Sequence, residues 1–185
     1  MKSSRGLSLF SFGFSLVVLD QIVKILVKSN MSLGEQIPIF GEWFRLCFVE
    51  NEGMAFGMKW GGAIGKYILS SFRLVLSGAL IVWIRSLLRK ENVPAGVLVG
   101  LTLITAGAVG NVIDCFFYGL IWEDAPFMLG KVVDMLYFPI IRNAAGQTVF
   151  FQPVFNIADS CVTVGALYLI LFQWKFFSSD EKKKS

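Results

Sequence analysis

Four long apolar stretches dominate the chain, near residues 7–27, 67–88, 94–121 and 154–177. A helix needs about 20 residues to cross a hydrocarbon core of roughly 30 Å, so each stretch is long enough to span a membrane. The third stretch exceeds that length, and we expect its last turns to emerge or tilt. The pattern predicts a membrane all-α protein with four transmembrane helices in one domain that covers residues 1–185.

The segments between the apolar stretches carry a different pattern. Apolar and other side chains alternate with period two over residues 37–49, which predicts strands, with Pro38 and Gly41 confining the first of them to an edge or a bulge. Residues 123–148 are punctuated by glycine and proline, and we expect an irregular segment there. The four helices are therefore expected to carry a small β element built from the two long connections, residues 30–65 and 122–153.

Composition supports the membrane assignment. Hydrophobic residues make up 55% of the chain and charged residues 16%, against roughly a quarter charged in soluble domains. The first apolar stretch follows basic residues, as in a cleaved signal peptide, but no small-x-small cleavage site follows it. Its outer half is also interrupted by Asp20, Gln21 and Lys24. We therefore expect a retained helix.

Basic residues gather at one side of the predicted topology. They are found in the N-terminal flank, in the connection near residue 89 and in the tail 178–185. The positive-inside rule places these segments, and with them both termini, in the cytoplasm. The net charge of +4 follows from this distribution. It does not indicate nucleic-acid binding, because no basic run is interleaved with stacking aromatic residues.

Residue types missing from the chain limit its chemistry. There is no histidine, which excludes Ser-His-Asp and Cys-His arrangements and most zinc sites. The three cysteines are scattered without CxxC spacing, so neither a disulfide framework nor a metal cluster is expected. Neither a metal nor another cofactor is expected, and aspartate remains as the main group for proton transfer.

Polar residues recur in the outer half of the apolar stretches. Asp20 and Lys24 are four residues apart, whereas Asn111 and Asp114, and Asn156 and Asp159, are three apart; Arg73 lies in the second stretch. A carboxylate within a membrane span is costly and marks a candidate functional site. For any single residue, a purely structural hydrogen bond between helices is an equal alternative. Convergence of the whole set favours a site.

Two aspartates form the expected catalytic pair. Asp159 would lie in the first turn of the fourth helix, where free N–H groups and the helix dipole favour its charge. Asp134 follows Val132 and Val133 on an expected loop and would be the partner that carries a proton. A capping box alone would explain Asn156 and Asp159, but it would not explain Asp134.

Five segments, in order, resemble the lipoprotein signal peptidase family, the signal peptidase II group of bacterial membrane aspartyl peptidases. The segments are Leu19-Asp20-Gln21-Ile22-Val23-Lys24, Asn51-Glu52-Gly53-Met54-Ala55-Phe56-Gly57, Ala106-Gly107-Ala108-Val109-Gly110-Asn111-Val112-Ile113-Asp114, Val132-Val133-Asp134 and Phe155-Asn156-Ile157-Ala158-Asp159-Ser160. Each segment is weak evidence alone, but their shared order and topology are specific. The resemblance implies four membrane helices with an outer β-cradle.

The resemblance also implies an activity and a location. These enzymes remove signal peptides from prolipoproteins by cutting before a diacylglyceryl-modified cysteine, and Asp134 and Asp159 would be the catalytic pair. The implied location is the bacterial inner membrane, with the site toward the outer face. Membrane lipids are implied partners, and peptide antibiotics of the globomycin type are implied inhibitors. Five further residues would bind substrate or support the pair, and two would support the fold: Asn51, Gly53, Asn111, Asp114 and Asn156, then Asp20 and Lys24.

One position departs from the family pattern. The family commonly has an arginine directly after the third-span aspartate, and this chain has Cys115 there. Arg73 is the candidate to supply that cation. A buried arginine otherwise needs a carboxylate partner, and Asp20 or Asp114 lies at a suitable depth to be one.

Two other functions would use the same polar residues differently. A proton-coupled transporter could use the aspartates as a relay, although such groups usually lie near the midplane within repeats. A structural subunit could use the long connections as its interface. Cleavage of a lipidated substrate would separate all three.

Overall fold

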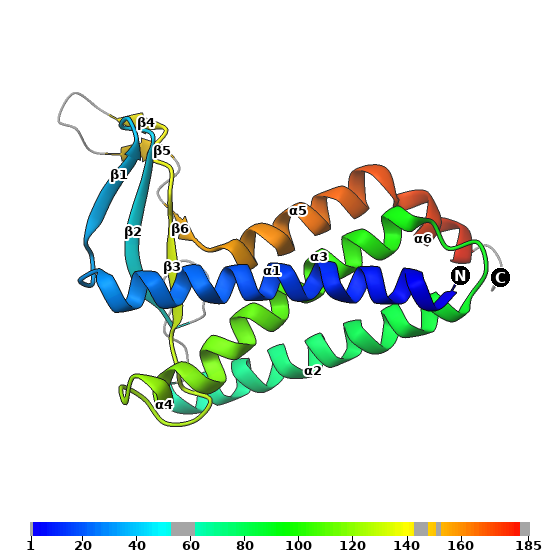
Figure 1. Cartoon of the computed structure of the whole chain (residues 1–185), viewed down its shortest axis with the longest axis horizontal. Helices are drawn as coiled ribbons and strands as arrows, with labels where there is room; N and C mark the ends of the chain where they lie inside the picture. The colour runs from blue at the N-terminus through cyan, green and yellow to red at the C-terminus, as the bar shows by residue number, and fades with distance from the viewer. Residues whose placement is uncertain (1, 53–61, 143–147, 151–152, 182–185) are drawn as a thin grey trace.

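The computed structural model describes residues 2–52, 62–142, 148–150 and 153–181. Three long helices run side by side, and a small antiparallel sheet covers one end of them (Figure 1). The helices are α1 (Lys2–Asn30), α2 (Gly62–Arg89) and α3 (Ala95–Ile113), followed by α5 (Ile157–Phe172) and α6 (Trp174–Glu181). The start of α1 and helix α6 lie at the end opposite the sheet.

Three helical segments are long and apolar enough to cross a membrane. They are Ser4–Asn30, Gly62–Arg89 and Ala95–Ile121, so the first three predicted stretches are long apolar helices. The third continues from α3 through a π-helical turn, η2 (Asp114–Tyr118), into the short α4 (Gly119–Ile121). Their lipid-facing positions carry exposed apolar side chains, as a membrane protein requires.

The predicted fourth span, 154–177, is not one helix. Residues 154 and 155 form strand β6 (Val154–Phe155), and α5 ends at Phe172, where Gln173 leaves helical geometry with φ −122°. The sixteen residues of α5 reach about 24 Å, less than the hydrocarbon thickness of roughly 30 Å. Hydropathy could not locate these ends, because apolar residues flank α5 on both sides, in β6 before it and at Trp174, Phe176 and Phe177 after it.

The main sheet has the order β1-β2-β3-β6, with every pair antiparallel. Its first three strands are β1 (Gln36–Phe40), β2 (Phe44–Asn51) and β3 (Val132–Tyr137). The period-two prediction is confirmed, and so are the edge position of β1 and a bulge after Pro38. A separate pair is formed by β4 (Ile141–Arg142) and β5 (Thr148–Phe150).

The prediction of an irregular segment at 123–148 is wrong for β3. This strand lies in the middle of the sheet, and its first four residues are buried. A strand buried on both faces has no alternation of apolar and polar side chains, so the period-two test does not detect it. Because β3 lies between β2 and β6 in the sheet that covers one end of the helices, Asp134 lies at that end.

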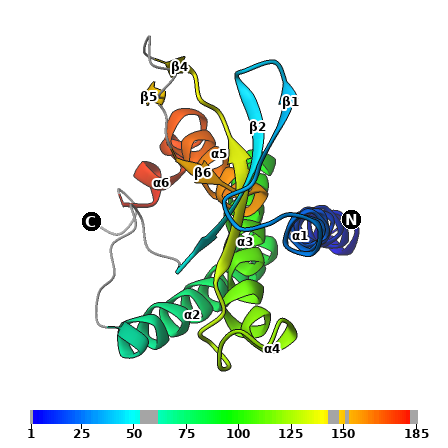
Figure 2. The same cartoon turned by 90° about the vertical axis from the view of Figure 1, so that its left-hand side faces the viewer.

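Helix α3 is the centre of the helical layer and packs against α1, α2 and α5, as Figure 2 shows from the sheet end. The contact with α5 is very close because both helices carry glycine. A Cβ at Gly107 would lie 2.2 Å from the Ala158 carbonyl oxygen, and one at Gly165 would lie 2.8 Å from that of Gly100. Glycine at position 107 therefore permits the close approach of α3 and α5.

Candidate active site

Asp134 lies within β3, opposite Val49 of β2, and its side chain is 2% exposed. The expectation that it lies on a loop is wrong. Its two carboxylate oxygens accept hydrogen bonds from two amides: Asn51 Nδ2 donates to Oδ2 at 3.1 Å, and Asn156 Nδ2 donates to Oδ1 at 2.7 Å. Asn51 is at the end of β2 beside the start of β3, so strand pairing brings it there.

Asp159 occupies the first turn of α5, as predicted. The Asn156 side chain accepts a hydrogen bond of 2.8 Å from the backbone N–H of Asp159, and Asp159 Oδ2 accepts one of 3.4 Å from the backbone N–H of Asn156. The pair is a capping box that satisfies two free N–H groups at the helix start. Asp159 is half-buried, and its charge is favoured by the helix dipole.

Two asparagines connect the aspartates. Asn156 donates to Asp134 and accepts from Asp159, so a single side chain contacts both. Asn111 of α3 donates a 2.8 Å hydrogen bond to Asp159 Oδ1, and its own oxygen accepts one of 3.2 Å from Asn156. The strand, α3 and α5 thereby fix the two carboxylates relative to each other.

Lys24 of α1 contacts this network through Asn111 and is completely buried. Its ammonium contacts three oxygens: Asn111 Oδ1 at 2.9 Å, Asp20 Oδ2 at 2.8 Å and Asp114 Oδ2 at 2.7 Å. The ammonium therefore makes one hydrogen bond, to Asn111, and two buried ion pairs. The predicted Asp20–Lys24 pair is confirmed, and Asp114 joins it. The Lys24 charge also polarises the Asn111 amide that donates to Asp159.

Asp20 connects α1 to the start of α5. Its Oδ1 accepts a 2.8 Å hydrogen bond from the backbone N–H of Ala158, one of the free donors at the α5 N-terminus. Glycine at position 110 leaves room for this contact, because a Cβ there would be 2.8 Å from Asp20 Oδ2. The start of α5, and therefore Asp159, is held from both α1 and α3.

The π-helical turn η2 fixes the position of β3. Cys115 and Phe116 carbonyls accept hydrogen bonds from the backbone N–H groups of Gly130 and Met128. A Cβ at Gly130 would lie 2.3 Å from the Asp114 carbonyl oxygen, so only glycine permits this approach. Strand β3 begins two residues later, and Asp134 is thus placed relative to Asp114 by backbone contacts.

The environment of Asp134 raises its proton affinity. Burial, and then the nearby charge of Asp159, raises the pKa of Asp134 from its ordinary 3.8 to about 7. Asp159 instead has the capping contacts that favour an anion. Near neutral pH Asp134 can therefore hold a proton beside the second carboxylate. Such a pair can provide one base and one acid.

The chain matches the family model described as signal peptidase (SPase) II over residues 13–175. The chain belongs to the signal peptidase II family. A lipoprotein signal peptidase of Porphyromonas gingivalis is 39% identical to it over 180 aligned residues, covering 84% of this chain and 78% of that protein. One from Pelodictyon phaeoclathratiforme is 32% identical, covering 92% of each.

Solved structures support the fold. A bacterial membrane enzyme determined by the in meso method at 2.3 Å resolution aligns with a TM-score of 0.65 at 23% identity, covering 93% of this chain and 90% of that one. The shared architecture is a helical membrane protein, and the apolar helices of this chain make it a multi-pass membrane protein of the signal peptidase II family.

The position that departs from the usual signal peptidase II pattern has a cation beside it. Arg73 reaches from α2, and its Nη1 is 3.2 Å from Cys115 Sγ. The expected pairing of Arg73 with Asp20 or Asp114 does not fit the observed contacts of those carboxylates, which are with Lys24, Gln21 and Ala158. A guanidinium therefore lies beside residue 115 although the residue itself is a cysteine.

Sequence reasoning missed two members of the network. Gln21 donates hydrogen bonds to Asp114 Oδ1 at 2.9 Å and to the Gly110 carbonyl at 3.2 Å, and Tyr118 donates to Gln21 at 3.2 Å. The available signal was a second polar residue, Gln21, directly after Asp20 within an apolar stretch. Gly53, which the family resemblance implies near the site, lies outside the described residues.

Proposed function

We propose that this protein is an aspartic endopeptidase that removes signal peptides from prolipoproteins, with Asp134 and Asp159 as its catalytic pair. Cleavage would be on the amino side of a diacylglyceryl-modified cysteine. The observation that carries the proposal is the meeting of two carboxylates, from β3 and from the start of α5, at the one side chain of Asn156.

The proposed chemistry needs one proton on the pair. Ionised Asp159 takes a proton from water, and the water oxygen attacks the carbonyl carbon of the scissile peptide bond. Protonated Asp134 then donates its proton to the leaving nitrogen as the C–N bond breaks. The products are a signal peptide with a new carboxylate and a lipid-modified cysteine with a free amine. Return of the proton from Asp159 to Asp134 restores the pair.

The surrounding polar residues would act as positioning groups. Asn51 and Asn156 hold the Asp134 carboxylate from both sides, and Asn111 holds that of Asp159. Asp114, Asp20 and Lys24 form the buried ion cluster on which Asn111 rests. Their arrangement before substrate binds reduces the reorganisation needed in the transition state.

The test of activity uses the purified full chain and a synthetic prolipoprotein peptide that carries a diacylglyceryl cysteine. Mass spectrometry should detect the signal peptide cut before that cysteine, and a matched peptide with an unmodified cysteine should be cut far less. Lack of cleavage of the lipidated peptide would refute the proposal. A peptide antibiotic of the globomycin type should inhibit the reaction if the site has the family's specificity.

The location is proposed from charge. Arg5, Arg85, Arg89 and Lys90 lie at the end of the helices away from the sheet, which supports a cytoplasmic position for that end and for both termini. The site would then face outward from the inner membrane of a bacterium. We also propose that α5 makes the fourth crossing, with α6 at its cytoplasmic end.

Labelling of single introduced cysteines in intact cells tests this orientation, because Cys47, Cys115 and Cys161 are buried. A membrane-impermeant thiol reagent should modify cysteine introduced at Gly34, which precedes β1, and should not modify cysteine introduced at Ser178. The opposite pattern would overturn the orientation.

A further inference from the structure

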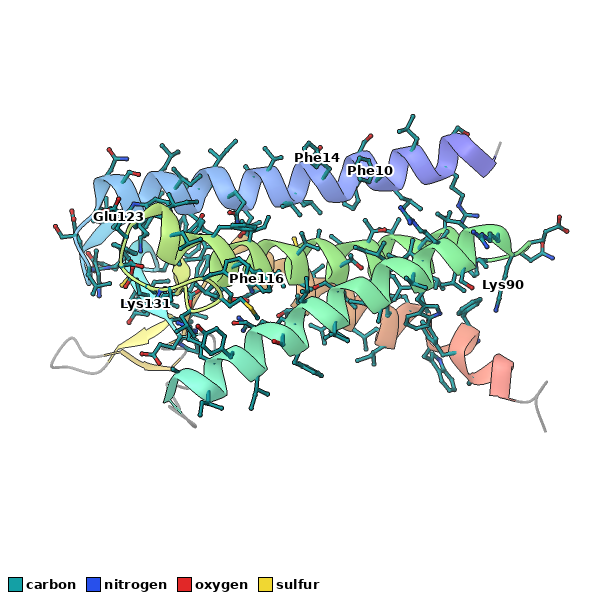
Figure 3. The ribbon with its side chains drawn as sticks, turned by 90° about the horizontal axis from the view of Figure 1, so that it is seen from below. Phe10, Phe14, Lys90, Phe116, Glu123 and Lys131 are labelled. Atoms are coloured by element: carbon teal, nitrogen blue, oxygen red, sulfur yellow. The ribbon has the colours of Figure 1, made fainter. Side chains whose placement is uncertain are left out.

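Helices α1, α2 and α3 enclose a groove at some distance from the aspartates. Helices α1 and α2 each pack on α3 but contact each other little, and the space left between them has a volume of about 780 Å³. Apolar side chains from all three helices line it, including Phe10, Phe14, Ile84, Leu88, Ala106 and Val109. Figure 3 labels Phe10 and Phe14 on α1, within the half of the helix away from the sheet.

The threonine hydroxyls in the groove wall already have hydrogen-bond partners. Thr102 and Thr105 line it, and their hydroxyls donate hydrogen bonds of 2.7 Å to the Leu98 and Leu101 carbonyls of their own helix. An occupant of this part of the groove finds methyl groups and aliphatic chains rather than hydrogen-bonding partners. The wall therefore suits a hydrocarbon chain.

One end of the groove is cationic. Arg85 lines it, and among the described residues Arg85 has no hydrogen bond or ion pair. Arg5 is nearby on α1, where its guanidinium donates to the Val93 carbonyl at 2.9 Å, and Lys90 lies at the turn between α2 and α3 (Figure 3). Glu91 is the one acidic residue of residues 2–9 and 85–95, which hold five cations. An anion is the complementary partner for this end.

We propose that the groove binds an anionic phospholipid, with one acyl chain between α1 and α2 and the phosphate at Arg85. The lining runs along α1 from Gly6 to Val17, which is about 16 Å at the helical rise of about 1.5 Å per residue. This is close to the depth of one leaflet, half of a hydrocarbon core of roughly 30 Å. The length of the groove, its apolar wall and the cation at its end all fit a single lipid of the leaflet at the basic end of the helices.

Charge favours a lipid over a signal peptide as the occupant. The apolar segment of a signal peptide also fits a groove of this kind, but its amino-terminal flank is positively charged. A peptide inserted with that flank at Arg85 and Arg5 would place like charges together, which costs free energy in a region of low dielectric. The phosphate of a lipid gains from the same cations.

The test compares two lipids with the same acyl chains, phosphatidylglycerol and phosphatidylcholine. The full chain, purified in detergent, is titrated with each, and native mass spectrometry and thermal unfolding measure the bound lipid and the shift in Tm. Phosphatidylglycerol should bind more tightly by about fivefold, as expected for one added cation contact. Arg85→Gln should remove that preference. Arg89→Gln is the matched control, since Arg89 is exposed on the same helix but does not line the groove.

A second pair of variants tests the chain-binding part. Val17→Trp fills the groove and should reduce retention of both lipids, whereas Val82→Trp, on an exposed position outside the groove, should not. Equal binding of the two lipids by the wild type, or an equal loss in Arg85→Gln and Arg89→Gln, would overturn the proposal. Displacement of lipid by a synthetic signal-peptide segment, with Val17→Trp blocking the peptide, would assign the groove to the peptide instead.

Discussion

The Asn156 amide lies 2.7 Å from Asp134 and is itself completely buried. Asn156 precedes α5 and Asp134 lies in the middle of β3, so this contact joins the sheet to the helical layer at the site. The same asparagine caps α5 through the N–H of Asp159. The helix cap and the link between the carboxylates are therefore one structural feature.

Substitution at Asn156 should separate these two roles. Asn156→Ala should lower stability by about 1 kcal/mol through the lost cap, with a further cost of about 1–3 kcal/mol because the buried Asp134 Oδ1 loses its donor. Asn156→Ser keeps a capping oxygen but removes the amide donor. Thermal unfolding should show partial recovery of Tm in the serine variant, while its cleavage rate should stay as low as that of the alanine variant. Full activity of Asn156→Ser would show that the amide contact to Asp134 is dispensable.

The pKa of Asp134 predicts a fall in activity above neutral pH. The proposed acid is the protonated form, and with a pKa of about 7 it is lost as the pH rises through that value. The pH dependence of kcat should therefore have a descending limb near pH 7, a property of the coupled pair. A rate that stays constant well into alkaline pH would contradict the role of Asp134 as the acid.

Stability should follow the same titration. Because folding raises the pKa of Asp134 above 3.8, its favourable contribution is complete below that value and is lost as pH rises through about 7. The Tm of Asp134→Asn should therefore increase relative to the wild type between about pH 5 and about pH 8. The substitution also alters hydrogen bonds, and this effect changes the Tm of the variant by the same amount at both pH values. The change in relative Tm between the two pH values is therefore unaffected by it.

Close packing of α3 on α5 should be required for the position of Asp159. Gly107→Ala would place a methyl group 2.2 Å from the Ala158 carbonyl oxygen, so α5 must shift and carry Asp159 away from Asn111. We expect a large loss of cleavage and a lower Tm. Gly78→Ala in α2 is the control, because no atom of the described residues would lie within 4 Å of the added Cβ. This variant should be neutral or more stable by about 0.5–1 kcal/mol. Equal behaviour of the two variants would contradict this account of Gly107.

The contact of Arg73 with Cys115 predicts a rescue. Arg73→Ala should reduce turnover of the lipidated peptide more than it reduces Tm, because it removes the guanidinium beside residue 115. Cys115→Arg in the Arg73→Ala background should restore part of the rate by returning a guanidinium to that place. Cys115→Arg alone should be impaired, since it brings two guanidinium groups together. Full activity of Arg73→Ala, or no rescue in the double variant, would refute the idea that Arg73 supplies the cation that the family usually has at position 115.

The features that were predicted correctly depend on local patterns in the sequence. Period-two alternation identified β1 and β2, and the spacing of Asp20 with Lys24 and of Asn156 with Asp159 indicated contacts that the structure contains. Apolar length identified three spans.

Contacts between distant segments could not be predicted in the same way. Strand β3 is buried on both faces, so its residues gave no alternation, and Asp134 was assigned to a loop. The end of α5 and the contact of Arg73 with Cys115 depend on packing between helices. Gln21 was missed because its partners Asp114 and Tyr118 are on another helix, more than 90 residues away.

The cleavage rates of Asp134→Asn and Asp159→Asn test the central claim most directly. An amide can neither take nor give the required proton, so each variant should lose about 10²–10⁴-fold in rate on the lipidated peptide while it remains folded and inserted. The double variant should be little worse than either single variant, because the two residues act as a unit. Asp124→Asn, which alters the partly exposed ion pair with Lys28, should keep the wild-type rate. Near-normal cleavage by either Asp134→Asn or Asp159→Asn would contradict the account.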